Sequence, residues 1–67
     1  MTDELKELKK DVSTKKRIAM DWASQVHDLV EDRLLNAYEE LPDLAQKTLE
    51  ACREWAESKA RYEAAEG

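Results

Sequence analysis

The sequence predicts an all-α fold, an antiparallel two-helix hairpin, and three observations support this. Charged residues make up 40% of the 67 positions, and there is no Phe. The single Gly is Gly67 and the single Pro is Pro42, so almost nothing before residue 41 would stop a helix. Apolar residues recur every three or four positions on both sides of Pro42, as in amphipathic helices. We therefore expect one domain, residues 1–67, with a helix over about 3–32, a corner over about 33–41 and a second helix over about 42–65.

The first expected helix carries one apolar stripe. Its members are Leu5, Leu8, Val12, Ala19, Trp22, Val26 and Leu29, with Lys15 at the one charged position. Asp3 and Glu4 suit the positive end of the helix dipole, so the helix is expected to begin beside them.

Pro42 is suited to the start of the second helix, because its ring fixes φ and its missing N–H would be unpaired there anyway. The second stripe consists of Leu44, Ala45, Thr48, Leu49, Cys52, Trp55, Ala56 and Tyr62. A short connection makes neighbouring helices antiparallel. Folding the chain about residue 37 would place Ala19 near Trp55, and Trp22 near Cys52.

Two helices shield only one seam, and the stripes hold more apolar surface than one seam covers. We expect an apolar interface with a second copy or another protein, made by Trp22, Val26, Leu29, Leu44, Cys52, Trp55 and Tyr62. Cys52 is interpreted as a buried structural thiol. One cysteine closes no internal disulfide, and no Cys/His group has zinc spacing. A chain this short is therefore expected to oligomerise or dock onto a partner.

The charge balance disfavours nucleic acid as a partner. The net charge is −5, the sum of +2 over residues 1–20 and −7 over residues 21–67. Lys9, Lys10, Lys15, Lys16 and Arg17 form a basic cluster that acidic residues interrupt, so we interpret it as a solvated helix face or a patch that meets an acidic protein. No segment has the apolar run of a membrane helix, and the start "MTDELKELKK" lacks the core of a signal peptide. With an unpaired thiol, these features predict a cytoplasmic protein without membrane contact.

Residues 27–42, "HDLVEDRLLNAYEELP", hold the only histidine and the only proline of the chain. His27 and Glu31 could hold a divalent metal weakly, but a His near a helix C-terminus with a carboxylate one turn on is favoured without metal. No catalytic arrangement or phosphate loop is present, so we predict a protein that is not an enzyme and has no cofactor. Around this corner gather Asp28, Glu31, Asp32, Glu39, Glu40 and Asp43. They either are simply solvated or complement a basic patch on a partner.

These residues carry a family resemblance. "HDLVED" at 27–32, a short acidic corner and "LPDLAQKTLEA" at 41–51 resemble the Rop-like helical-hairpin family of nitrogen-fixation gene clusters. In that family a His-Asp-Leu triplet and an acidic pair close the first helix, and a proline leads into an Ala-Gln-Lys-Thr segment. The resemblance covers about residues 19–52. This chain has "RLLNAY" where the family tends to have a second proline, so either the first helix runs further or the corner carries its own helical turn.

The resemblance implies a cytoplasmic α-hairpin that assembles into bundles and has an accessory role around nitrogenase. We expect a non-enzymatic protein that binds and stabilises or holds a nitrogenase component protein or a cofactor-maturation factor. Two alternatives are a small metal carrier or sensor that uses His27 and nearby carboxylates, and a self-assembling helical-bundle scaffold. The candidate partner-binding residues are His27, Asp28, Glu31, Asp32, Tyr38, Glu39, Glu40, Pro42, Asp43, Gln46 and Lys47.

Overall fold

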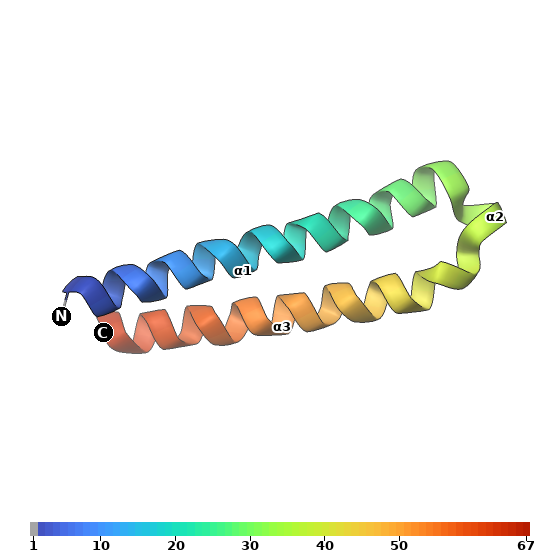
Figure 1. The fold of residues 1–67 in the computed structure, drawn as a ribbon. Coiled ribbons are helices and arrows are strands. Elements are labelled where there is room, and N and C mark those ends of the chain that lie inside the picture. Colours follow the sequence, from blue (N-terminus) through green and yellow to red (C-terminus); the bar gives the residue numbers. More distant parts are fainter. Residues whose placement is uncertain (1) are drawn as a thin grey trace.

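Two long helices make up most of the computed structural model, which describes residues 2–67. Helix α1 (Thr2–Asp28) and helix α3 (Leu41–Glu66) lie side by side and antiparallel, so the start of α1 and the end of α3 share one end of the molecule (Figure 1). The Cα atoms span 51 × 14 × 12 Å, which is the shape of a rod. The prediction of an all-α chain is confirmed for the residues described.

The corner that joins α1 to α3 is helical along its whole length. It consists of a π-helical turn (Leu29–Arg33), the one-turn helix α2 (Leu34–Ala37) and a 3₁₀ turn (Tyr38–Glu40). Arg33 (φ −133°, ψ 11°) and Ala37 (φ −139°, ψ 24°) leave the helical region, and these two breaks turn the chain back. Helix α1 therefore ends four residues before the predicted residue 32, and of the two possibilities left open, the corner carries its own helical turn.

Helix α3 begins and ends close to the predicted positions. Pro42 lies in its first turn, where the missing N–H breaks no helical hydrogen bond, and Asp43 in the same turn suits the helix dipole. At the other end the Gly67 N–H donates to the Glu63 carbonyl over 2.9 Å. The observed span Leu41–Glu66 thus exceeds the prediction by one residue at each end.

The seam between α1 and α3 follows an alternating three–four spacing, the repeat of a coiled coil. Its buried and half-buried residues are Leu5, Leu8, Val12, Lys15, Ala19, Trp22, Val26 and Leu29 on one side, and Leu41, Leu44, Thr48, Ala51, Trp55, Ser58 and Tyr62 on the other. Among residues 3–67, the buried residues are Ala19, Leu29, Ala51 and Ser58, and of these Leu29 and Ser58 have no exposed surface. The core of the isolated hairpin is therefore thin.

The register of the two helices differs from the predicted one by about one helical turn. Four pairs join the two helices: Asp11 with Ser58, Asp11 with Arg61, Lys15 with Glu54, and Trp22 with Lys47. The residue numbers of three pairs add to 69 and those of Asp11 and Arg61 add to 72, whereas the predicted pairs add to 74. Trp22 therefore lies beside Lys47 and not beside Cys52. The physical reason is that the corner occupies residues 29–40, so the chain folds about residues 34–35 and not about residue 37.

The expectation of a buried thiol in the hairpin is wrong, because Cys52 is exposed. Ala45 and Ala56 are exposed as well, and Leu49 keeps 44% of its surface accessible. The predicted stripe of the second helix therefore combined two adjacent strips. One strip packs in the seam, and the other runs alongside it on the surface.

Candidate functional site

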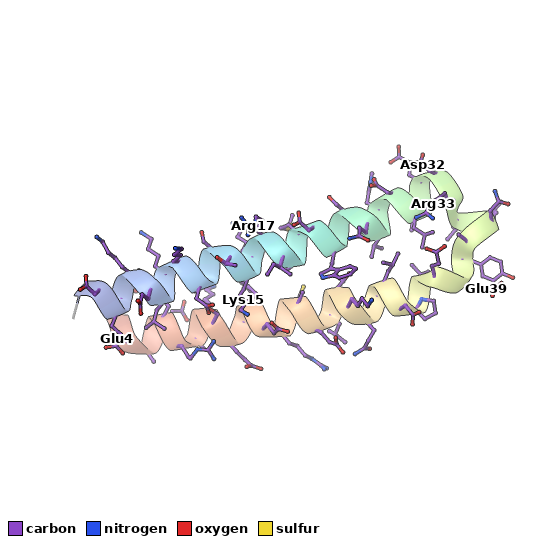
Figure 2. The ribbon with its side chains drawn as sticks, viewed as in Figure 1. Glu4, Lys15, Arg17, Asp32, Arg33 and Glu39 are labelled. Atoms are coloured by element: carbon purple, nitrogen blue, oxygen red, sulfur yellow. The ribbon has the colours of Figure 1, made fainter. Side chains whose placement is uncertain are left out.

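One lateral side of the hairpin is closed by polar contacts between the helices. Lys15 Nζ lies 3.3 Å from Glu54 Oε1, and Arg61 lies 3.6 Å from Asp11. The Lys47 ammonium stands 5.3 Å from the centre of the Trp22 ring, a cation–π distance. In Figure 2 Lys15 points across toward the second helix. Lys15, the one charged residue of the predicted α1 stripe, is thus paired with a carboxylate. We call this side the polar side.

A hydroxyl–carboxylate contact belongs to the same polar side. The Ser58 hydroxyl, which is fully buried, donates to the Asp11 carboxylate across the seam. This hydrogen bond holds the pKa of Asp11 below its usual value, although burial of the carboxyl works in the opposite direction. The sequence prediction missed Ser58. Its spacing, three residues after Trp55 and four before Tyr62, places Ser58 in the seam and could have identified it.

The opposite lateral side exposes apolar side chains. We call this surface the lateral apolar face; it consists of the half-buried Ala23 and of the exposed Met20, Val30, Ala45, Leu49, Cys52 and Ala56. Each member directly follows a seam residue in the sequence. In two antiparallel helices these positions point to the same side, so the strips of α1 and α3 adjoin. Met20, Val30 and Leu49 are 60%, 49% and 44% exposed. A small protein has little reason to leave three large apolar residues on one side unless something covers them.

The predicted apolar interface divides between these surfaces. Leu29 is fully buried, and Trp22, Val26, Leu44, Trp55 and Tyr62 are half-buried in the seam. Cys52 lies on the lateral apolar face. The hairpin therefore already uses most of the predicted interface to hold its own helices together.

The corner brings the predicted acidic residues together at one end of the rod. All eleven candidate partner-binding side chains are exposed. Asp32, Arg33 and Glu39 gather at this end in Figure 2. Arg33 lies 3.7 Å from Glu40, so the basic residue of this segment is already engaged by a neighbouring carboxylate. Other candidate side chains contact residues of the long helices: Gln46 donates to Glu50 over 3.0 Å, and Lys47 stands over Trp22.

His27 is held between two carboxylates. Its Nε2 lies 3.1 Å from Glu31 and its Nδ1 3.6 Å from Asp28, and its side chain is 71% exposed. His27 and Glu31 are therefore in contact, as the sequence predicted. Within residues 2–67, however, no three His, Cys, Asp or Glu side chains gather as they would to hold a metal ion.

The helices of residues 2–67 include none with the length and apolar character needed to cross a membrane. The geometry defines a class of protein: a rod-shaped helical hairpin with one polar side, one lateral apolar face and an acidic corner. The chain belongs to the Rop-like family, whose model matches residues 3–67. The match extends beyond the corner to both long helices. No curated protein matches the chain, and no solved structure does.

Proposed function

We propose that the protein is a non-enzymatic accessory protein that binds another protein and stabilises or holds it. The observation that carries this proposal is the lateral apolar face. Its large apolar residues stay exposed although the two helices are already packed, and the opposite side is bridged by ion pairs. Helices of a partner that pack on this face would extend the thin core of the hairpin into a bundle.

The partner that we propose is a nitrogenase component protein or a cofactor-maturation factor. This finer step is supported by the resemblance of residues 27–51 to proteins of nitrogen-fixation gene clusters. The acidic corner, which carries that resemblance, supplies charge that can orient the hairpin on a basic surface of the partner.

A binding experiment tests the proposal with two matched variants. Leu49→Glu places a charge on the lateral apolar face, and Ile18→Glu places the same charge on the polar side, where Ile18 is 38% exposed. We expect the wild type and Ile18→Glu to capture a nitrogenase component or maturation factor from a nitrogen-fixing extract, and Leu49→Glu to lose it. Equal capture by all three chains would contradict the role of this face.

A second candidate, a self-assembling bundle, is favoured by the same face together with its charges. Lys9, Lys16 and Lys59 lie toward one end of this side, and the acidic corner lies at the other. Two antiparallel copies would therefore bring opposite charges together at both ends. Sedimentation of the purified chain tests this candidate: a dimer that Leu49→Glu dissociates and Ile18→Glu leaves intact indicates self-assembly, whereas a monomer at all concentrations contradicts it.

A further inference from the structure

The tip of the rod exposes a second group of apolar side chains. It adjoins the lateral apolar face at Val30, which lines the same surface hollow as Leu35. Leu35 is 87% exposed, more than any other large apolar residue among those described, and Tyr38 is 60% exposed. They lie three positions apart, on α2 and directly after it, at the end of the molecule remote from the start of α1 (Figure 1). A Leu and a Tyr placed at an extremity can enter a pocket on another molecule without hindrance from the rest of the chain.

The two breaks in the helical backbone explain why these side chains face outward. Arg33 and Ala37 bracket α2, so that one turn of helix caps the hairpin. Leu34 and Ala37 of this turn are half-buried, whereas Leu35 and Asn36 are exposed. The outer side of the turn thus carries Leu35 where a polar residue would cost nothing in the isolated hairpin.

The charge around the tip restricts what can cover it. Residues 28–43 hold six acidic groups and Arg33, a net charge of −5, which equals the net charge of the whole chain. The other 51 residues hold ten acidic and ten basic groups and are neutral as a set. Arg33 is engaged by Glu40 at 3.7 Å, so the surroundings of Leu35 and Tyr38 are negative.

This charge disfavours three occupants and favours one. The tip of a second copy, a nucleic acid and an anionic membrane surface all carry like charge, which opposes close approach. A protein surface with an apolar pocket and a rim of Lys and Arg residues satisfies both features of the tip. The apolar pair then supplies the buried anchor, while the acidic residues meet the basic rim.

We propose that Leu35 and Tyr38 form the anchor by which this protein docks, tip first, into an apolar pocket rimmed by basic residues on its protein partner. The proposal rests on the proposed function, since it assumes a protein partner, but it concerns Leu35 and Tyr38 at the tip, whereas Leu49 probes the lateral apolar face outside the hollow that Leu35 lines. Failure of one surface therefore leaves the other testable.

Photo-cross-linking in the full chain provides the test. A benzophenone amino acid is placed at position 35 in one sample and at position 49 in another, and each is irradiated in a nitrogen-fixing extract. We expect the probe at position 35 to label an apolar peptide of the partner that lies beside Lys or Arg residues. Labelling from position 49 alone would overturn the tip proposal and keep the proposed function. Labelling from neither position would overturn both.

Binding of the purified partner identified in this way gives the quantitative arm. Leu35→Ser is expected to weaken binding at least about tenfold, because the anchor residue of an interface carries a large share of the affinity. Ile18→Ser, a matched change at an apolar residue of the polar side that is 38% exposed, serves as the control and should leave binding unchanged. The double variant Asp32→Lys, Glu39→Lys should weaken binding and reduce its dependence on salt. Unchanged binding by Leu35→Ser, with the helical content of the wild type, would overturn the proposal.

Discussion

The hydrogen bond between Ser58 and Asp11 is one of the polar contacts that join α1 to α3. Ser58 is fully buried, and its hydroxyl donates to Asp11. The change Ser58→Ala removes this donor, and we expect a loss of about 1 kcal/mol in the free energy of unfolding. For a chain of this size that loss lowers Tm by about 4–8 °C, which thermal unfolding followed by circular dichroism would measure. Ser13→Ala, at an exposed position of α1, controls for helix propensity and should not lower Tm.

The Asp11 carboxylate of the same pair should make the stability of the hairpin depend on pH. The pKa of Asp11 lies below its ordinary value of 3.8 in the folded protein, because Ser58 hydrogen-bonds the charged form. A lowered pKa contributes stability above the ordinary value, and this contribution is lost as pH falls through the folded value. The difference in Tm between wild type and Asp11→Asn should therefore be largest at neutral pH and shrink below pH 3.8. A difference that stays constant over this range would show that the carboxylate charge contributes nothing.

The elements of the hairpin depend on how the corner is anchored. Leu29 begins the π-helical turn and has no exposed surface, so its side chain fixes the end of α1 in the seam. Leu29→Ala should lower the free energy of unfolding by about 2–5 kcal/mol, as expected for a buried leucine whose cavity cannot fully collapse. The neighbouring Val30→Ala, at a side chain 49% exposed, should have a much smaller effect. Equal effects in urea unfolding would contradict the assignment of Leu29 to the core.

Apolar periodicity predicted the helices but not how they are aligned with each other. The long helices, the start of α3 near Pro42 and the α1 stripe follow from local sequence, because apolar spacing and proline geometry act within a few residues. The register does not follow, since it depends on where the corner begins, and the π-helical turn at Leu29 has no sequence signal as clear as a proline. The surface position of Cys52 was missed for a related reason: Ala51 and Ser58, small residues without a strong apolar signal, fill seam positions of the second helix.

The outward Leu35 was missed because it looked like part of an apolar run. In "RLLNAY" the two leucines are equivalent by composition, and only the backbone breaks at Arg33 and Ala37 separate them. Leu34 becomes half-buried, and Leu35 becomes the most exposed large apolar residue among those described. The acidic character of the corner, in contrast, could be predicted from the sequence, because charge depends on composition and not on side-chain orientation.

At the scale of the whole molecule, all the net charge lies at one end of a thin rod. Like charges at the corner repel one another, and the small core offers little to offset this repulsion. Neutralising two corner residues by Asp32→Asn and Glu39→Gln should therefore raise Tm at low salt. The gain should diminish as the salt concentration rises, because a Debye length of about 8 Å at 0.15 M screens exposed charges.

A control variant separates this effect from a general benefit of removing carboxylates. Glu57→Gln neutralises an exposed residue of α3 outside the corner, in the part of the chain whose charges balance, and should leave Tm nearly unchanged. A gain in Tm for the control equal to that of the corner variant would show that the corner is not a centre of repulsion. If the corner variant gains stability but loses affinity for the partner, the acidic residues are retained for binding at a cost to folding, as a charged docking tip requires.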